Sequence, residues 1–264
     1  MRLQKDYGLI GYPLSHSISP FVHGEIFKRT KEKNNYSLYE IQPEELSGKY
    51  TLLSSLAGFN VTAPLNELIL PYCEKLDKSA DCGVVNCVNN EKVGFNTDIF
   101  GFEKSVKALG ASLKSRVCLI GYGGAGKMIA HAVEKAGGKL TITEKDPKKM
   151  LKSGVKVNLV KTKALSGSFD LIINASPVGS YPKIKNSPVN FKKIKAAFAL
   201  DLIYTPYKTE FLKLAETAGA KTMNGVTMLV WQSIKSHEAW YGGKVSDNEA
   251  VEIIEATRKF LGGA

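Results

Sequence analysis

The stretch from residue 117 to residue 137 restricts the fold of this chain most, because glycines join a strand pattern to a helix pattern there. It reads VCLIGYGGAGKMIAHAVEKAG, with VCLI apolar throughout and a helical spacing of apolar residues in the second half. The turn between them consists of Gly121, Tyr122, Gly123, Gly124, Ala125 and Gly126. Glycines let the backbone turn tightly and approach a pyrophosphate, whose charge is stabilised at a helix N-terminus. The stretch predicts a dinucleotide-binding β-α unit; a tight turn without a ligand is the alternative.

The strand expected at 139–143 ends at Glu144, which bears on the choice of dinucleotide. An acidic side chain at this distance from the glycine turn accepts hydrogen bonds from the ribose hydroxyls of NAD and repels the 2′-phosphate of NADP. Lys145, Lys148 and Lys149 follow and would reverse that preference. A solvated loop explains the same residues, so the residues alone leave NAD and NADP open.

Further apolar runs at 169–176 and 197–204 are typical of strands buried on both faces. Helical patterns at 208–218, 226–241 and 247–261 accompany them. Such β-α-β repetition predicts a parallel sheet with crossover helices. Ligands of such sheets bind outside the carboxyl ends of the strands, so the loop that begins at Asn174 would border the cofactor.

The first third of the chain alternates expected strands with expected helices. The strands lie at 6–11, 36–41, 58–62, 84–89 and 92–95, and the helices at about 20–33, at 43–55 and from Leu65 to about 77. Ser17 and Ser19 would point to one side of an extended segment and could hold a carboxylate, although Ser19 is also suited to cap the following helix.

Composition argues for small anionic ligands rather than macromolecular ones. The net charge is +11, but its lysines are spread along the chain, so we expect no nucleic-acid binding. No apolar run approaches the roughly 20 residues of a membrane span, and we expect a cytoplasmic protein without membrane contact. The dispersed histidines and cysteines predict no metal site.

Eight segments together resemble the shikimate dehydrogenase family, in the family's order and over nearly the whole chain. They are GYPLSHSISPFVH, GFNVTAP, CGVVNCV, GFNTDIFGF, IGYGGAG, INASPVG, DLIYTPYKT and NGVTMLVWQS. The resemblance implies an α/β fold with an N-terminal substrate domain at 1–98 and a Rossmann domain at 99–241. The C-terminal helix at about 242–264 would pack on the first domain, and the active site would be a cleft between the two. The implied reaction is the reversible NADP(H)-dependent reduction of 3-dehydroshikimate to shikimate, by a monomer or homodimer.

The resemblance also implies a role for particular residues. Ser17 and Ser19 would hold the substrate carboxylate, and Thr62, Asn86, Asp98 and Gln232 would bind its hydroxyls, with Tyr204 nearby. Gly121, Gly123, Gly124, Ala125 and Gly126 would bind the pyrophosphate, and Gly225 and Met228 would face the nicotinamide.

The chain departs from the family pattern at three places. Glu144 and Lys145 stand where the family has Asn-Arg, which favours NAD as the alternative cofactor. Cys87 replaces a threonine beside Asn86, a modest change. Asn66 stands where the family has the lysine that pairs with Asp98 in acid–base chemistry. An amide has no titratable proton, so we expect intact binding with impaired turnover. An NAD-dependent quinate or shikimate dehydrogenase and a non-catalytic shikimate-binding homologue are the alternatives.

Overall fold

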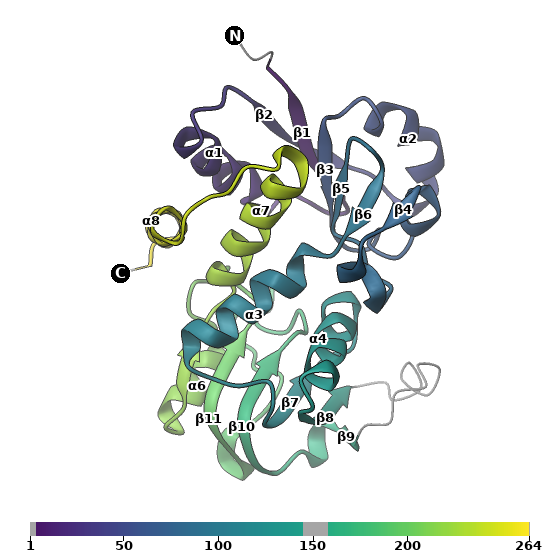
Figure 1. The fold of residues 1–264 in the computed structure, drawn as a ribbon. Coiled ribbons are helices and arrows are strands. Elements are labelled where there is room, and N and C mark those ends of the chain that lie inside the picture. The colour runs from purple at the N-terminus through teal and green to yellow at the C-terminus, as the bar shows by residue number, and fades with distance from the viewer. Residues whose placement is uncertain (1–3, 145–157, 264) are drawn as a thin grey trace. The chain divides into compact units, whose positions relative to one another are not determined.

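The structure, a computed structural model, describes residues 4–144 and 158–263, which form two compact units (Figure 1). The first comprises Met1–Gly101 and Leu229–Thr257, and the second comprises Phe102–Met228 and Arg258–Ala264. The α/β class expected from the sequence is confirmed. No helix within the described residues is long and apolar enough to cross a membrane.

The first unit is built on a mixed six-stranded sheet with the order β2-β1-β3-β5-β6-β4. Strands β1 (Asp6–Gly11), β2 (Asn35–Glu40) and β3 (Gly58–Val61) are parallel, and β5 (Cys87–Asn89) is antiparallel to β3. Strand β6 (Val93–Phe95) is antiparallel to β5 and forms a hairpin with it, and the short β4 (Lys75–Leu76) completes the sheet. Helices α1 (Ser19–Arg29) and α2 (Leu46–Leu53) connect the parallel strands.

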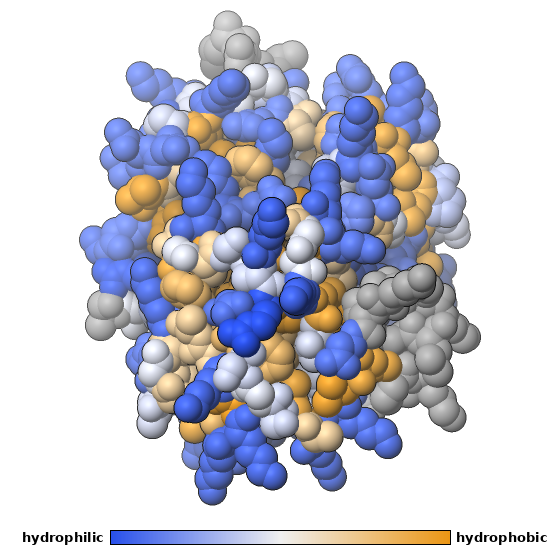
Figure 2. All heavy atoms as spheres, turned by 60° about the horizontal axis from the view of Figure 1, so that its bottom comes forward, coloured by the Kyte–Doolittle hydropathy of each residue, from blue (hydrophilic) through white to orange (hydrophobic). Residues whose placement is uncertain are grey.

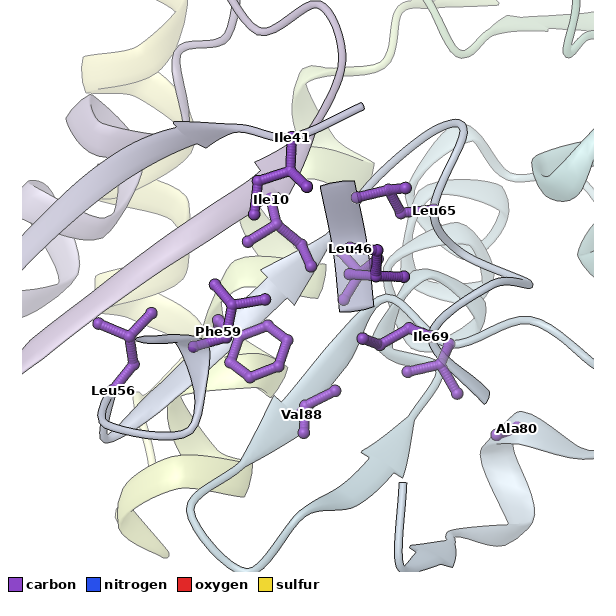
Figure 3. Packing of buried hydrophobic residues seen from close by; sticks show 12 residues of the cluster. Ile10, Ile41, Leu46, Leu56, Phe59, Leu65, Ile69, Ala80 and Val88 are labelled. Carbon is purple, nitrogen blue, oxygen red and sulfur yellow. The ribbon is translucent and has the colours of Figure 1, made fainter. Parts of the chain in front are cut away.

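One apolar cluster holds this sheet to the segments that follow its strands (Figure 3). Ile10 and Phe59 come from β1 and β3, and Leu46 comes from α2. Leu65 and Ile69, both fully buried, come from the segment after β3. Burying such side chains contributes roughly 1.5–3 kcal/mol each, which fixes that segment on the sheet.

The helix expected from Leu65 to about 77 is wrong: the segment forms turns and a 3-10 helix at Leu70–Tyr72. Pro71 has no N–H to donate within a helix. In addition, the carbonyl of Asn66 accepts the N–H of Val85 at 3.0 Å, which takes it out of any helical ladder.

The second unit contains a parallel sheet with the order β12-β11-β10-β7-β8-β9. The strands are β7 (Arg116–Ile120), β8 (Lys139–Glu144), β9 (Asn158–Lys161), β10 (Gly167–Asn174), β11 (Ile194–Asp201) and β12 (Lys221–Met223). Counted along the chain from β7, this is the 3-2-1-4-5-6 order of the doubly wound dinucleotide-binding fold. The order reverses between β7 and β10, so the loops that follow these two strands flank the switch point where ligands bind.

The other α-helices within the described residues are α3 (Thr97–Leu109), α4 (Gly124–Lys135), α6 (Glu210–Thr217), α7 (Val226–Tyr241) and α8 (Asp247–Phe260). Residues 229–241 of α7 belong to the first unit, whereas the sequence analysis had assigned them to the second domain. The reason is aromatic packing, because the ring of Trp240 stacks on Tyr7 of β1 at a centroid distance of 4.8 Å. In α8, Glu252 accepts a hydrogen bond from Arg29 of α1 at 3.3 Å.

Candidate functional site

Buried polar side chains of the first unit form a hydrogen-bonded network around Asn86. The Oδ1 atom of Asn86 accepts the backbone N–H of Thr97 at 2.6 Å, and its Nδ2 donates to Oε1 of Gln232 at 3.4 Å. Asn60 Nδ2 donates to the Asn86 carbonyl at 3.0 Å and to Ser236 Oγ at 2.8 Å. The fold thus brings together Asn86 and Gln232, two residues that the sequence analysis had singled out separately.

The hydroxyls of Ser17 and Ser19 lie together as expected, with 3.1 Å between their oxygens. Ser19 is the first residue of α1 and its side chain makes no capping hydrogen bond, since the N-cap position belongs to Ile18. The expected capping role of Ser19 is therefore wrong. Both hydroxyls remain able to take part in binding a carboxylate.

Asn66 forms a structural bridge between two backbone segments. Its Nδ2 donates to the carbonyl of Val61, the last residue of β3, at 2.8 Å and to the carbonyl of Val85 at 3.2 Å. An amide NH2 has two hydrogens, so both are used within the protein. Thr62, on the same segment, is half-buried, and its N–H donates to the Ile10 carbonyl at 2.9 Å.

Asp98 lies in the first turn of α3, directly after Thr97. Burial raises the pKa of its carboxyl to about 6, while a hydrogen bond from the Asn86 side chain acts in the opposite direction. A carboxyl group with this pKa exchanges its proton near neutral pH, which suits acid–base chemistry.

The glycine turn of the second unit has the tight backbone that the sequence predicted. Gly121 follows β7 with φ +94°, and a Cβ there would lie 3.1 Å from the carbonyl oxygen of Ala175 and the N–H of Ser176. A Cβ on Gly126 would overlap the Gly121 carbonyl. Gly123 is the N-cap of α4, so Gly124 and Ala125 form its first turn and their N–H groups have no helical acceptor. A pyrophosphate fits such a turn, because glycine permits its approach and the helix N-terminus favours its charge.

Glu144 ends β8 beside this turn, where its carboxylate accepts the N–H of Tyr122 at 3.1 Å. Glu144 is half-buried. Lys145, Lys148 and Lys149, which were expected to reverse the cofactor preference set by Glu144, lie outside the described residues.

Asn174 is fully buried at the end of β10 and links the loop after it to β11. Its Nδ2 donates to Oδ1 of Asp201 at 3.0 Å and to the carbonyl of Val178 at 3.2 Å, and its Oδ1 accepts the Ser176 N–H at 3.1 Å. These bonds occupy the side chain, so Asn174 shapes the loop rather than offering a free amide. Asp201 Oδ2 in turn accepts the Thr209 hydroxyl at 2.6 Å.

The remaining predicted residues of the second unit follow β11 and β12. Tyr204 is half-buried, and burial raises the pKa of its hydroxyl. Gly225 donates its N–H to the Ile203 carbonyl at 3.2 Å, and a Cβ on Gly225 would collide with the Leu202 carbonyl. Met228 is buried, with 8% of its surface exposed.

Two polar residues that hydrogen-bond to predicted site residues, Thr97 and Asp201, were not among the candidates from the sequence. Each had a signal: Thr97 lies inside the NTD segment, and Asp201 is a lone acid within the apolar run AFALDLIY. In the part of the chain that the structure describes, no three His, Cys, Asp or Glu side chains gather as a metal ion requires.

Comparisons with known proteins point to one family. Residues 9–88 match the family model of the shikimate dehydrogenase substrate binding domain. The chain is 36% identical to the shikimate dehydrogenase (NADP(+)) of Methanococcus vannielii, over 94% of this chain and 97% of the relative. It is 32% identical to that of Caldicellulosiruptor bescii, over 96% of both chains.

Similar solved structures cover the whole fold. A chorismate mutase/shikimate 5-dehydrogenase fusion protein from Clostridium acetobutylicum has a TM-score of 0.91 and 30% identity, covering 99% of this chain and 100% of that one. Shikimate 5-dehydrogenase from Thermus thermophilus in complex with NADP(H) and shikimate has a TM-score of 0.87 and 28% identity, covering 96% and 99%. Shikimate 5-dehydrogenase from Listeria monocytogenes in complex with shikimate and NAD has a TM-score of 0.78 and 26% identity, covering 95% and 96%.

Proposed function

Because the chain belongs to the shikimate dehydrogenase family, we propose that it catalyses the reversible NADP(H)-dependent reduction of 3-dehydroshikimate to shikimate, with slow turnover. The relatives at 36% and 32% identity are named shikimate dehydrogenase (NADP(+)), which supports the reaction and the cofactor. The slow turnover follows from Asn66. In this proposal the first unit binds the substrate and the second binds the dinucleotide.

The first unit supplies the substrate contacts in this proposal. Ser17 and Ser19 would hold the carboxylate, since their hydroxyl oxygens lie 3.1 Å apart and hydroxyls can donate to carboxylate oxygens. Asn86 and Gln232, which already contact each other, would bind the ring hydroxyls together with Thr62 and Asp98. Residues locked by their own hydrogen bonds hold a substrate in a fixed geometry, which lowers the barrier to reaction.

The second unit supplies the dinucleotide contacts. The turn from Gly121 to Gly126 would bind the pyrophosphate, with the chain at Gly225 and Met228 beside the nicotinamide. When bound, the dinucleotide supplies or accepts the hydride. Glu144 would bind the adenosine ribose, and the loop ordered by Asn174 would border the site.

Proton transfer is the step that slows the reaction in this proposal, because the chain has Asn66 where the family has a lysine. Reduction of the ketone leaves an alkoxide that needs a proton, and oxidation of the alcohol needs a base. The observation that carries slow turnover is that Asn66 has no titratable proton and donates both amide hydrogens to the carbonyls of Val61 and Val85. Asp98, with its pKa raised to about 6 by burial, would then exchange the proton alone.

Steady-state oxidation of shikimate by NADP, in the wild type and in Asn66→Lys, tests this proposal. Loss of a positioned acid–base group typically costs about 10²–10⁴ in rate, so Asn66→Lys should raise kcat by about that factor. Leu68→Lys adds the same charge at an exposed neighbouring position and should leave the rate unchanged. Equal rates for the wild type and Asn66→Lys would refute impairment, and shikimate turnover in neither protein would refute the reaction.

An NAD-dependent quinate or shikimate dehydrogenase is the second candidate function, and Glu144 favours it. A carboxylate at that position repels a 2′-phosphate and accepts hydrogen bonds from ribose hydroxyls. The same assay run with NAD and with quinate separates the two. A higher kcat/KM with NAD than with NADP supports the second candidate. Tight shikimate binding by calorimetry without turnover supports a non-catalytic homologue instead, which Asn66 also favours.

A further inference from the structure

The connection between β9 and β10 in the second unit is unusually short. Strand β9 ends at Lys161 and β10 begins at Gly167, although β8 and β7 lie between them in the sheet. Parallel strands are normally joined by a dozen or more residues that form a covering helix. Here the connection contains only a 3-10 turn at Thr162–Ala164. The connection between β9 and β10 therefore supplies no helix to cover the sheet.

A groove of about 890 Å³ lies beside this connection. Its apolar lining includes Leu165, Val189 and Phe191, which belong to the core of the second unit, and Leu214 of α6. Pockets that hold small organic ligands have volumes of about 300–1,000 Å³ and mostly apolar linings, and this groove fits both descriptions.

The polar side chains at the groove are mainly cationic. Lys163, Lys192 and Lys193 line it and are exposed. Within residues 4–144 and 158–263, none of these three lysines has a carboxylate within ion-pair distance.

The surrounding sequence adds no compensating charge. From residue 158 to residue 200 there are lysines at 161, 163, 183, 185, 192, 193 and 195, but the one acidic residue is Asp170. Its carboxylate is already paired with Arg116 at 2.9 Å. Figure 2, which brings forward the face at the bottom of Figure 1, shows projecting hydrophilic residues around hydrophobic patches.

We propose that this groove binds an organic anion with an apolar body, such as an aromatic carboxylate or sulfonate. The ring would lie against Phe191 and Leu214, where it loses contact with water, and the charge would meet Lys163, Lys192 and Lys193. A simple inorganic anion would gain nothing from the apolar lining, and a neutral ring would gain nothing from the lysines.

This site is separate from the dinucleotide site proposed above. The groove includes Ile194, where β11 begins, whereas Gly121 follows the end of β7. Because β7, β10 and β11 run parallel, these two positions lie at opposite edges of the second sheet. An anion in the groove should therefore bind without displacing the dinucleotide, and the inference does not depend on the proposed reaction.

Calorimetric titration of the full-length protein with 1-naphthalenesulfonate tests the site. 1-Naphthalenemethanol serves as the neutral ring and sodium sulfate as the anion without a ring. The charge variant is Lys163→Glu/Lys192→Glu/Lys193→Glu. Its matched control is Lys183→Glu/Lys185→Glu/Lys195→Glu, which makes the same charge change on exposed lysines of the same segment that do not line the groove. Ala218→Trp fills the groove from an exposed position and leaves the core intact.

We expect one saturable site for the sulfonate, with the alcohol and the sulfate binding at least about tenfold more weakly. The groove triple variant and Ala218→Trp should each weaken sulfonate binding about tenfold or more, and the control triple variant less than about threefold. The proposal is overturned if no saturable binding occurs, if the alcohol binds as tightly as the sulfonate, or if the two triple variants weaken binding equally. Unchanged affinity in Ala218→Trp would overturn it as well.

Discussion

The side chain of Asn66 has a structural role that can be measured apart from catalysis. Its amide joins the end of β3 to the segment before β5 through the carbonyls of Val61 and Val85, which are 2% and 0% exposed as residues. Asn66→Ala removes both donors and leaves both carbonyls without this partner. We therefore expect the variant to be folded but less stable than the wild type.

The expected loss follows from the two hydrogen bonds. Leaving a buried acceptor unsatisfied costs about 1–3 kcal/mol, so two of them set a range of about 2–6 kcal/mol. Asn66 is half-buried, so water can reach the space that the truncated side chain leaves and can replace part of the lost bonding. We therefore expect Asn66→Ala to lower the free energy of unfolding by about 2–3 kcal/mol.

Asn66→Asp tests the loss of the two donors separately from a change of shape, because aspartate has nearly the same shape as asparagine. At pH 7 its carboxylate would face two carbonyl oxygens, losing both donors and adding repulsion, so its loss should exceed that of Asn66→Ala. Protonation restores one donor. The two carbonyls raise the pKa of this half-buried carboxyl, so the stability of Asn66→Asp should recover toward that of Asn66→Ala, or above it, as the pH falls through that raised pKa, and the recovery should be complete below about pH 4.

Urea unfolding followed by tryptophan fluorescence suits this measurement. Trp231 and Trp240 are the two tryptophans of the chain, and both belong to the first unit, as does Asn66. Leu68→Ala, at a side chain with 44% exposure, is the control and should change the stability by no more than about 0.5 kcal/mol. A loss below about 0.5 kcal/mol in Asn66→Ala, or identical pH dependence in Asn66→Ala and Asn66→Asp, would refute the reasoning.

Three further substitutions follow from the same kind of reasoning. Burial raises the pKa of Asp98 to about 6, so the stability that its neutral form provides is complete below about pH 4 and is lost as the pH rises through 6. Thermal unfolding should therefore show Asp98→Asn gaining stability relative to the wild type between pH 4 and pH 7, while its dehydrogenase activity disappears. Asp201→Asn should instead lower the free energy of unfolding in urea by about 1–3 kcal/mol, because the amide keeps an oxygen for Asn174 and Ile203 but puts a donor where Oδ2 accepts the Thr209 hydroxyl. Gly225→Ala should cost about 1–3 kcal/mol and raise the KM for NADPH, because its Cβ would collide with the Leu202 carbonyl, whereas Gly24→Ala in α1 meets open space and should add about 0.5–1 kcal/mol.

Local features of the fold were predictable from the sequence because their causes are local. The glycine at position 121 is required by φ +94° and by the backbone of Ala175 beside it. The strand and helix around the turn follow from apolar spacing within a few residues. The segment after β3 shows where such spacing misleads, since Leu65 and Ile69 are buried as a helix would bury them while Leu68 is exposed and the backbone forms turns.

Contacts between residues far apart in the sequence could not be predicted from sequence patterns. Asn86 and Gln232 are 146 positions apart and meet through their side chains. Asp201 is a lone acid in an apolar strand, and its sequence neighbours do not reveal its hydrogen bonds to Asn174 and Thr209. No spacing rule connects such residues, because the fold and not the local backbone brings them together.

The sequence by itself determined the α/β class, the tight glycine turn between β7 and α4 and the absence of a titratable group at position 66. Each of these depends on residue type or on the conformational preference of a short stretch. Only the tertiary structure decided the strand order that forms the switch point between β7 and β10, and the use of the Asn66 amide to join Val61 to Val85. Both depend on which segments lie next to one another, and that is set by the burial of apolar surface over the whole unit.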